Sequence, residues 1–577
     1  MSAVQDDIPR RISIRAVADR STSFGRRLFW LAPALDKLLG IDAMHRFAEQ
    51  NQLYGLPPEE FATKALQGLG VDVAGAEALA ERLPESGPTI IVANHPHGGI
   101  EGMVMVHLLA ALRPDVKIMA NTALRVFNEL TPYFIFVNPL QPRHPSNARG
   151  LRESLKHLRN GGVLVMFPAG RTSFYQPDLK CIADAEWNRS VATLARKTNA
   201  HVLPMRFTGR NSERFYRLGA IWYRFRLLML ARELMKTTNR SINVVVGRAF
   251  PSKPFAARSD AEFTEILQTQ SAALQPEQPP TKVAVGAMEP LIDTPDRAVI
   301  AAEIDALPAH QRVLDARGLT VGFGTRAQLP TLVEDIARER ERTFRLLDEG
   351  SGLALDTDRF DDIYDHLFCW DTQSQALVGA YRIGRRDHLL ANGGNYLAHV
   401  FDFDPAFFES RAPALELGRS FVTPEFQRSR HALDFLWRGI GGYLRVYPNY
   451  GTLYGTVSLT TQYDPVSIAM ICDALIDETP TVKPRIATDG MLPAEWHRLR
   501  RRQTVDISLV NALVAAREAD GKGLPVLLRH YAGLGAKFHA VGIDPNFART
   551  PGLLLSVDLA TLPDAKRRRY IDTENGD

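Results

Sequence analysis

The chain has 577 residues, 45% of them hydrophobic and 23% charged, and its 69 Lys and Arg against 65 Asp and Glu give a formal net charge of +4. This composition excludes a disordered or collagen-like chain, and so small a net charge does not indicate a nucleic-acid partner. At roughly 150 residues per domain, the length predicts two to four domains.

The N-terminal segment and the cysteines bear on the cellular compartment. Residues 1–27 contain several arginines but no apolar core, so we predict no secretory signal. Cys181, Cys369 and Cys472 lie far apart without Cys-x-x-Cys spacing, which argues against a disulfide scaffold or a structural zinc site. No window of about 18 residues is free of charge, which argues against a membrane-spanning helix. We therefore expect a cytoplasmic protein.

The first half of the chain alternates short β-rich runs with stretches of helical period. This alternation is typical of an α/β fold, in which functional residues gather at the ends of strands. The predicted strands cover residues 89–93, 116–120, 134–137, 163–167, 201–207 and 242–246. Predicted helices cover residues 103–112 and 147–158.

A histidine follows the strand at 89–93 directly, and an acid stands where the next helix begins. His95 as a neutral imidazole can take a proton from a hydroxyl, while the carboxylate of Glu101 on its other nitrogen fixes the tautomer. Gly98 and Gly99 allow the turn between them to close tightly. In the alternative interpretation, His95 and His97 are ordinary turn residues and Glu101 complements a helix N-terminus.

Two further segments extend this motif. Phe167-Pro168-x-Gly170-Arg171-Thr172-Ser173 follows the strand at 163–167, and Leu203-Pro204 lies in the strand at 201–207. Together with Asn94-His95-Pro96, Gly99 and Glu101, they resemble the glycerolipid and lysophospholipid acyltransferases. The resemblance implies that His95 is the base, Glu101 its partner, and Pro204 a residue that shapes the site. It also implies an acceptor pocket formed in part by Gly170, Arg171, Thr172 and Ser173.

The chain departs from the usual family pattern at two positions. Five residues separate His95 from an acid that is a glutamate, whereas the family commonly has four residues and an aspartate. The longer spacing resembles the haemolysin-like branch, and His97 is the second candidate for the base. Ala169 stands where the family commonly has glutamate, so acceptor contacts made by that acid are absent here.

The segment from Ser212 to Met235 is rich in Arg, Leu and aromatic residues. At about 100° per residue, Arg226 falls opposite the sector shared by the other arginines Arg214, Arg217, Arg224 and Arg232. Two interpretations fit, an interfacial helix on anionic lipid or a core helix with a solvated basic edge. The basic tracts 498–502 and 566–569 could assist. We expect peripheral contact with the anionic inner face of the cytoplasmic membrane.

A proline-rich segment divides the chain. Three prolines within a few residues stiffen the chain near its middle, so we predict a first domain over 1–272, a linker over 273–286 and a second domain over 287–577. The second domain again alternates short strands and helices, which predicts a second α/β domain. The alternating segments are 320–324, 328–344, 376–383, 415–422, 432–443 and 452–458.

Charged residues in the second domain suggest a site for a cationic amino acid. A strand carrying Glu416 can present a carboxylate to a substrate amine, and Arg419 can hold an anionic group, while Asp361 and Asp365 add negative charge. Attack of an amine on a thioester requires a neutral amine and donors for the developing oxyanion, but no metal. In the alternative interpretation, these residues pin loops between strands.

The same segments resemble the N-acyltransferases that make lyso-ornithine lipid. Those enzymes are relatives of the acyl-homoserine-lactone synthases within the N-acetyltransferase-like superfamily. The resemblance rests on Arg340-Glu-Arg-Thr-Phe344, on residues 360–368, 378–382 and 415–422, and on the late segments 524–535 and 542–547. It implies an acyl-carrier-protein thioester as donor and no cofactor. The implied polar site residues are Asp361, Asp365, Arg382, Glu416 and Arg419.

The two halves together resemble the bifunctional ornithine-lipid synthases of bacteria. The resemblance implies that the second domain N-acylates ornithine with a 3-hydroxyacyl group and that the first O-acylates the resulting lyso-lipid. One alternative is a lysophospholipid acyltransferase fused to an N-acyltransferase for glycine or glutamine. Another is a membrane adaptor without activity that docks acyl-carrier protein. The sequence leaves open the amino acid, the chain length and the oligomeric state.

Overall fold

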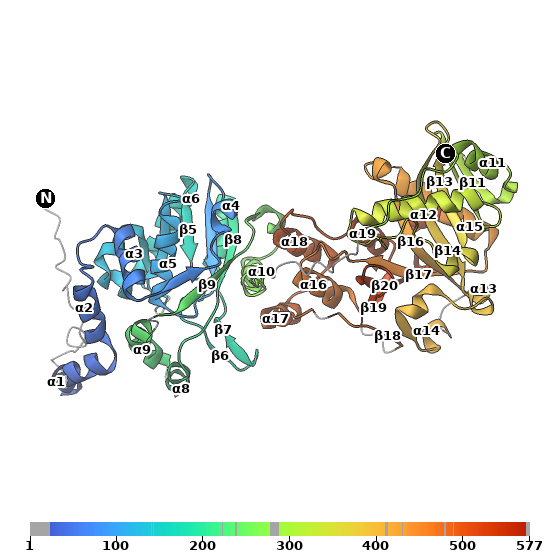
Figure 1. Cartoon of the computed structure of the whole chain (residues 1–577). Helices are drawn as coiled ribbons and strands as arrows, with labels where there is room; N and C mark the ends of the chain where they lie inside the picture. The colour runs from blue at the N-terminus through green and yellow to red at the C-terminus, as the bar shows by residue number, and fades with distance from the viewer. Residues whose placement is uncertain are drawn as a thin grey trace. The chain divides into compact units, whose positions relative to one another are not determined.

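Figure 1 shows the computed structural model of the chain. It describes residues 23–139, 141, 144–221, 223–236, 239–276, 288–409, 413–429, 431–477, 481–488 and 490–572. These residues form two compact units, each with its own eight-stranded sheet. Both units are mixed α/β, which confirms the predicted fold class.

The sheet of the first unit is mostly parallel and has the strand order β1-β9-β8-β2-β5-β3-β4, with β10 paired to β8. Only β8 with β9 and β8 with β10 run antiparallel. The strands are β1 (Asp72–Ala74), β2 (Thr89–Ala93), β3 (Val116–Asn121), β4 (Phe134–Val137), β5 (Val163–Met166), β8 (His201–Phe207), β9 (Ser241–Val246) and β10 (Phe250–Pro251). All six predicted strands are present, because apolar β-branched runs suit strands buried on both faces.

The helices of the first unit lie around this sheet (Figure 1). They are α1 (Ser23–Leu38), α2 (Ile41–Gln50), α3 (Pro58–Gly68), α4 (Leu79–Arg82), α5 (Gly99–Leu109), α6 (Pro145–Arg159), α7 (Ser190–Thr198), α8 (Glu213–Ile221), α9 (Tyr223–Lys236) and α10 (Asp260–Ala272). A separate hairpin joins β6 (Phe174–Gln176) to β7 (Cys181–Ala183). Helix α5 begins four residues before the predicted start, so Glu101 lies in its first turn.

The predicted helix over 212–235 corresponds to two described helices, α8 and α9, and residue 222 between them lies outside the described residues. Arg214 and Arg217 are exposed on α8, whereas Arg232 is half-buried on α9 and donates to the Leu38 carbonyl. The side chain of Arg224 lies outside the described residues. None of the helices described is long and apolar enough to cross a membrane.

The first unit also includes two segments from late in the sequence, Leu492–Thr504 and Ala515–Gly521. In helix α17 (Ala494–Arg502), Arg502 pairs with Glu186 at 2.7 Å and lies 3.7 Å from Glu265. Arg248 donates to the carbonyls of Ala515 and Glu518. The prediction of one boundary did not anticipate these segments, and the predicted linker residues 277–286 lie outside the described part of the chain.

The sheet of the second unit has the order β11-β12-β13-β14-β16-β17-β20-β19. Its strands are β11 (Arg312–Ala316), β12 (Leu319–Gly324), β13 (Asp365–Asp371), β14 (Ala376–Arg385), β16 (Ala414–Val422), β17 (Thr452–Ser458), β19 (Lys537–Asp544) and β20 (Thr550–Asp558). Only β16 and β17 of this sheet run parallel, and they pair with each other only at their first four residues. Strand β16 stays paired with β14 as far as Val422, and β17 stays paired with β20 as far as Ser458. The two strands therefore diverge in the middle of the sheet.

Helices pack on this second sheet and complete its core. They include α11 (Arg297–Asp305), α12 (Pro330–Arg345), α13 (Arg386–Ala391), α14 (Ala406–Glu409), α15 (Ala432–Val446), α16 (Pro465–Leu475), α18 (Ile507–Arg517), α19 (Val526–Gly533) and α20 (Asp564–Arg567). A short two-stranded sheet pairs β15 (Phe401–Phe403) with β18 (Val482–Pro484). The six segments predicted for this domain coincide with β12, α12, β14, β16, α15 and β17.

Gly441 provides a test of the packing of α15. A Cβ at this position would clash with the backbone carbonyl oxygen of Tyr570. We expect Gly441→Ala to destabilise the second unit by about 1–3 kcal/mol, because the new methyl group can be accommodated only if the packed backbone moves. Differential scanning calorimetry would show the lower melting temperature. Gly533→Ala, on α19 with open space around the new methyl group, is the control and should not lower it. Equal melting temperatures for the two variants would contradict the packing.

Candidate active sites

The first candidate site lies at the carboxyl ends of parallel strands in the first unit. His95 follows β2 by two residues, and the segment from Gly170 to Ser173 follows β5. Strands β2 and β5 are neighbours, and Val92 of β2 is in register with Pro204 of β8. This is the edge of a parallel sheet at which ligands usually bind.

His95 and Glu101 are in direct contact. Nδ1 of His95 lies 2.6 Å from Oε2 of Glu101, whose side chain is fully buried at the start of α5. The same carboxylate accepts the backbone N–H groups of His97 at 2.7 Å and Gly98 at 2.9 Å. These bonds hold the carboxylate in place, so a neutral His95 carries its proton on Nδ1 and presents Nε2 as the basic atom.

His97, the second candidate for the base, is oriented differently. Its Nε2 lies 2.9 Å from the backbone oxygen of Thr208, which requires a proton on that nitrogen. Its own backbone N–H, rather than its ring, is bonded to Glu101. The geometry therefore favours His95 over His97 as the group that removes a proton.

Glu101 makes His95 more basic. Burial opposes protonation of the ring, but the charge and contact of Glu101 outweigh burial, and the pKa of His95 is raised above its ordinary value of 6.5. If His95 is the base, we expect kcat/KM for hydroxyl acylation to rise with pH and to level off above this raised pKa, since only the neutral ring accepts a proton. Rates measured from about pH 5 to 9 would test this.

The matched variant for this pH profile is Glu101→Gln, which removes the charge that raises the pKa of His95. Its profile should shift toward lower pH as its maximum falls. Stability and activity depend on pH in opposite directions. The ion pair between protonated His95 and Glu101 stabilises the fold at low pH, and this stabilisation is lost as pH rises through the raised pKa of His95. A wild-type profile with a midpoint below 6.5, or one unchanged by the variant, would contradict the arrangement.

Asp184 is a buried residue of this site that the sequence motifs did not single out. Its Oδ1 accepts the backbone N–H of His95 at 3.1 Å and the hydroxyl of Ser173 at 2.6 Å. Its Oδ2 accepts the indole N–H of Trp187 at 3.0 Å, and the N–H of Ser173 donates to the His95 carbonyl at 2.8 Å. Ser173 and Asp184 therefore fix the backbone of His95.

The remaining predicted residues of the first site surround this centre. Thr172 is buried, whereas Arg171 is exposed and lies over the ring of Phe174. Gly170 has a φ of 66°, and a Cβ there would lie 2.8 Å from Pro139. The structure thus brings His95, Glu101 and Ser173 together and places Arg171 at the rim.

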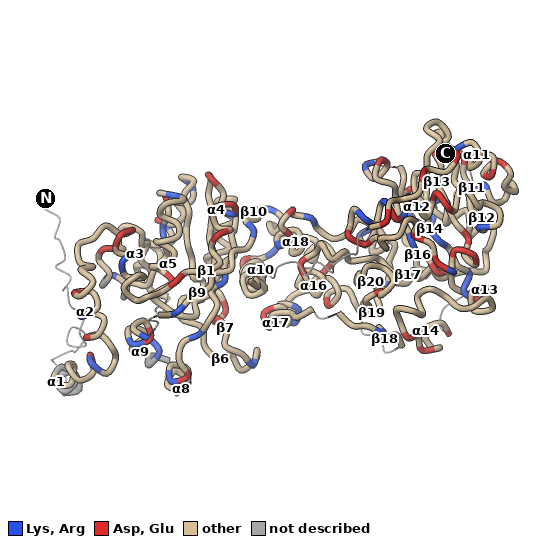
Figure 2. Tube along the Cα trace, viewed as in Figure 1, with Lys and Arg blue, Asp and Glu red and all other residues tan. Residues whose placement is uncertain are grey.

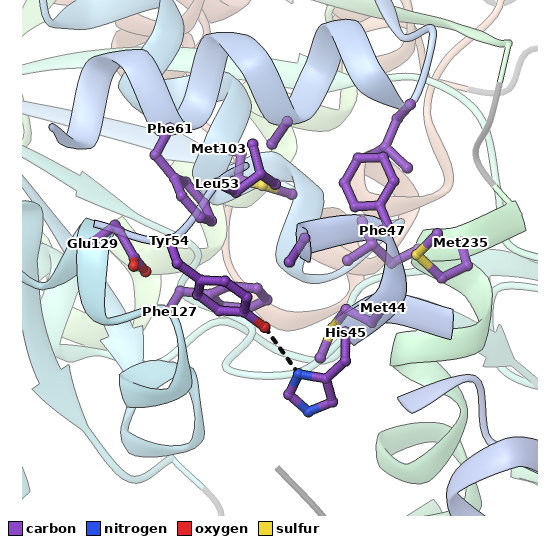
Figure 3. Close-up of a pocket in the computed structure, with 14 residues that line it drawn as sticks. Met44, His45, Phe47, Leu53, Tyr54, Phe61, Met103, Phe127, Glu129 and Met235 are labelled. Carbon is purple, nitrogen blue, oxygen red and sulfur yellow. Dashed lines mark hydrogen bonds between the residues drawn. The ribbon is translucent and has the colours of Figure 1, made fainter. Parts of the chain in front are cut away.

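An apolar pocket lies beside the middle of α5 (Figure 3). Met103 of α5 lines it with aromatic and aliphatic side chains of α2, α3 and α9, and the ring of His45 bonds the Tyr54 hydroxyl at 3.1 Å. The cavity measures about 50 Å³.

The second candidate site lies where β14 and β16 pair in the second unit. Arg382 of β14 is in register with Gly418 of β16, and the register shifts between Ala380 and Arg382. Opposite this shift, Arg419 adopts a left-handed φ of 49°, which is uncommon for a side chain other than glycine. Irregularities of this kind redirect a side chain. Here Arg419 follows closely after the last residue of β16 that pairs with β17.

Arginines and aspartates lie close together where α12 meets β14 and β16 (Figure 2), and Arg340, Arg382 and Asp361 among them are buried. Arg382 lies 2.7 Å from Asp358 and 3.4 Å from Asp361. Arg340 of α12 lies 2.6 Å from Asp356 and 3.5 Å from Asp361. Burial opposes ionisation of Asp361, but the charges of Arg340 and Arg382 prevail and lower the pKa of Asp361. The carboxylate is therefore ionised at neutral pH.

Arg419 completes this cluster. Its Nη1 lies 3.3 Å from Asp356, and its Nη2 donates to the hydroxyl of Tyr396 at 3.0 Å, which in turn donates to Asp544 at 2.7 Å. The Nε atoms of Arg382 and Arg419 and Oδ2 of Asp358 are buried without a hydrogen bond among the described residues. These atoms can serve a polar substrate.

Glu416 is buried beside the arginines but is bonded to neutral groups. It accepts the hydroxyls of Tyr364 at 2.8 Å and Tyr454 at 3.0 Å and the amide of Asn395 at 2.7 Å. Burial raises the pKa of Glu416, and these donors offset only part of the effect. Arg382 lies over the Tyr364 ring at 5.0 Å, so Glu416, Arg382 and Arg419 belong to one site.

Asp365 does not join this site. It is in register with Ile383, whereas its neighbour His366 is in register with Arg382, so Asp365 faces the opposite side of the sheet. There it accepts the hydroxyl of Tyr443 at 2.7 Å. Sequence reasoning grouped Asp365 with Asp361, but strand alternation separates them.

The residues that sequence reasoning missed share one property, which is that their partners are distant in sequence. They are Asp184, Asp356, Asp358, Tyr364, Asn395, Tyr396, Tyr454 and Asp544. The available signals were weak: Asp184 precedes Trp187 by three residues, and Asp356, Asp358 and Asp361 form a closely spaced acidic run.

Two protein-family models match the chain. One, described as Acyltransferase, matches residues 16–263. The other, described as Acetyltransferase (GNAT) domain, matches residues 340–438. The first covers the first candidate site and the second covers most of the other, including the charged cluster around Arg382.

The chain is similar to enzymes that acylate amino acids and their lipids. It is 28% identical over 314 residues to a Glycine N(alpha)-acyltransferase of Bacteroides thetaiotaomicron, covering 50% of this chain and 90% of the relative. It is 30% identical over 197 residues to a Lyso-glycine lipid O-acyltransferase of Phocaeicola vulgatus, covering 33% and 68%. It is 27% identical over 292 residues to an L-ornithine N(alpha)-acyltransferase of Agrobacterium fabrum, covering 47% and 92%.

Solved structures of two kinds are also similar. One is the 1-acyl-sn-glycerophosphate (LPA) acyltransferase PlsC from Thermotoga maritima, with a TM-score of 0.25 and 19% identity, covering 44% of this chain and 82% of that one. The other is the CoA-dependent acyl-homoserine lactone synthase MesI, with a TM-score of 0.22 and 12% identity, covering 43% and 94%.

Proposed function

This chain belongs to the acyltransferase family, and we propose that its two units catalyse successive acyl transfers that build an amino-acid lipid. It is an enzyme that transfers acyl groups, and its relatives act in both N-acylation and O-acylation. The observation that carries the proposal is the presence of two separate candidate sites in one chain, the first within the matched Acyltransferase model and the second mostly within the matched Acetyltransferase (GNAT) domain model.

In the first proposed step, the second unit acylates the α-amine of ornithine. Glu416, whose pKa is raised by burial, takes the proton of the substrate ammonium group. The amine attacks the carbonyl carbon of a 3-hydroxyacyl thioester on acyl-carrier protein. The amide C–N bond forms and the C–S bond breaks, and the proton that the nitrogen loses as the amide forms goes to the leaving carrier thiolate. Buried guanidinium groups of Arg382 and Arg419 hold the substrate carboxylate.

In the second proposed step, the first unit acylates the 3-hydroxyl of the lyso-lipid. Nε2 of His95 removes the hydroxyl proton, and the contact with Glu101 at 2.6 Å stabilises the imidazolium that forms. The alkoxide attacks a second acyl thioester, so an ester C–O bond forms while the C–S bond breaks. The imidazolium then returns its proton to the leaving thiolate. No metal or nucleotide cofactor takes part in this proposal.

Two amino acids are supported by different observations. Ornithine carries a side-chain ammonium group, and the buried Oδ2 of Asp358, which makes no hydrogen bond among the described residues and lies 3.8 Å from Arg419, offers an acceptor for it. Relatives that act on ornithine are named among the similar proteins. Glycine is the second candidate, because other relatives act on glycine and on lyso-glycine lipid. With either lyso-lipid as acceptor, the enzyme would act at the cytoplasmic face of an anionic membrane.

Expression in a bacterium that lacks amino-acid lipids, followed by lipid mass spectrometry, tests the proposal. Isotope-labelled ornithine and glycine, supplied in separate cultures, would identify the amino acid. We expect a new diacyl lipid that carries labelled ornithine. Altered phospholipid acyl chains without an amino-acid lipid would favour a lysophospholipid acyltransferase. Binding of acyl-carrier protein without any turnover would favour an adaptor role.

A further inference from the structure

Arg226 of α9 is a buried cation beside the first candidate site. Its side chain is only 8% exposed, and its guanidinium group lies 4.2 Å from the ring centroid of Phe174. Its aliphatic part packs against Gly219, where a Cβ would leave it no room. The helical period had set Arg226 apart from the other arginines of this segment, and the structure explains this difference because Arg226 points inward.

No acid neutralises Arg226 within the described part of the chain. Its Nη1 is buried without a hydrogen bond, and it has no ion pair there. Burial and the like charge of Arg171 both lower the pKa of Arg226. An unpaired buried charge is destabilising, and stacking on an aromatic ring compensates only in part. Such a residue is typical of a site that a ligand of opposite charge completes.

Arg171 is the second cation at this place. It belongs to the segment from Gly170 to Ser173 that holds the backbone of His95, and its guanidinium lies 5.5 Å from the centroid of the same Phe174 ring. Arg171 is exposed, whereas Arg226 is buried, so the pair opens to solvent on the side of Arg171. Two guanidinium groups of like charge therefore lie around one aromatic ring.

Helix α9, which carries Arg226, also contacts the turn between His95 and Glu101. Leu230 follows Arg226 by one helical turn, on the same face of the helix. It lies against Gly98, where a Cβ would be 2.8 Å from Leu230 Cδ2 and 3.5 Å from Thr172 Cγ2. Gly98 is three residues from His95 and bonds the same Glu101 carboxylate. The two arginines thus adjoin the site at which a hydroxyl would be activated.

We propose that Arg171 and Arg226 form an anion site that receives the carboxylate of the N-acyl amino acid while its 3-hydroxyl is acylated. This inference rests on the proposed function. Guanidinium groups bind carboxylates through paired hydrogen bonds, and the free Nη1 of Arg226 is a donor of this kind. The phosphate of a lysophospholipid has the same chemistry, so the experiment includes both anions.

Kinetics of the purified full-length protein test the site. The acceptors are N-(3-hydroxyacyl)ornithine and its methyl ester, which lacks the negative charge. We expect Arg226→Gln to raise KM for the free acid by about tenfold or more, to a value close to that for the ester, and to leave KM for the ester within about twofold. Arg226→Lys should recover part of the affinity. An equal loss with both acceptors would overturn the proposal.

Thermal melting separates binding from structure. Because Arg226 is an unpaired buried charge, Arg226→Gln should melt at the same temperature as the wild type or higher, whereas removal of a structural arginine would lower it. Arg171→Gln, at the exposed member of the pair, should shift KM in the same direction without affecting folding. Arg152→Gln, on the exposed face of α6, is the matched control and should change neither KM nor melting.

A parallel assay with lysophosphatidate distinguishes failure of the inference from failure of the proposed function. If the wild type acylates lysophosphatidate but not the N-acyl amino acid, the proposed function is wrong, and a raised KM in Arg226→Gln would assign the site to phosphate rather than carboxylate. If the wild type acylates the N-acyl amino acid and Arg226→Gln keeps its KM for the free acid, the proposed function stands and the anion site is rejected.

Discussion

His95→Ala is expected to lower O-acyl transfer by about 10²–10⁴-fold, the range that general base catalysis contributes, and to leave N-acyl transfer at the wild-type rate. The variant keeps the contacts that hold the backbone at this position, because Asp184 accepts the main-chain N–H and the N–H of Ser173 donates to the main-chain carbonyl. It lacks only the ring that would take the proton. Cells that express it should therefore accumulate the monoacyl lipid.

The control for this prediction is His97→Ala. This variant removes a ring that is bonded to the Thr208 carbonyl, but leaves the contact between His95 and Glu101 in place. We expect it to retain O-acyl transfer within about tenfold. Lipid mass spectrometry and a thioester assay with supplied lyso-lipid would measure O-acyl transfer in both variants. A His95→Ala protein that still makes the diacyl lipid at the normal rate would reject His95 as the base.

Glu416→Gln is expected to lower N-acyl transfer by about 10²–10⁴-fold without affecting O-acyl transfer to supplied lyso-lipid. Glutamine has nearly the same volume. With its carbonyl oxygen in the place of Oε2 it still accepts from Tyr454 and Asn395, and its NH2 group can donate to the Tyr364 hydroxyl. It cannot take a proton from an ammonium group. The loss would therefore reflect the missing base rather than a collapsed pocket.

Asp365→Asn is the control for Glu416→Gln. Asp365 is also a buried acid in the same unit with a tyrosine partner, but it faces the other side of the sheet. We expect this variant to N-acylate the amino acid at close to the wild-type rate when it is folded. Single-turnover assays with acyl-carrier-protein thioester would compare the two. Full activity in Glu416→Gln, or complete loss in folded Asp365→Asn, would contradict the assignment of the base.

Strand positions were the most predictable part of the fold. Apolar runs such as 89–93 and 163–167 are buried on both faces of a parallel sheet, so composition alone indicates strands there. The helix expected over 212–235 corresponds to α8 and α9, which the helical period alone does not separate. A period shows which residues share a face but does not show where a helix ends.

The candidate sites were predictable only where their residues follow strands in recognisable motifs. His95, Glu101 and Ser173 belong to such motifs, and the structure brings them together. Asp184 and Asp358 depend on partners that only the fold brings near. Asp365 shows the reverse, because assigning it to a face requires the pairing of β13 with β14, which no single segment reveals.

The late segments of the first unit affect how the two reactions could be separated genetically. A gene truncated after the linker would encode an acyltransferase half without residues 492–504, and Glu186 and Glu265 would lose the arginines that neutralise them. The complementary fragment would carry helix α17 without the first unit, to which that helix belongs. Proteins with a single activity are therefore better made by point substitutions that inactivate one site at a time than by truncation of the gene.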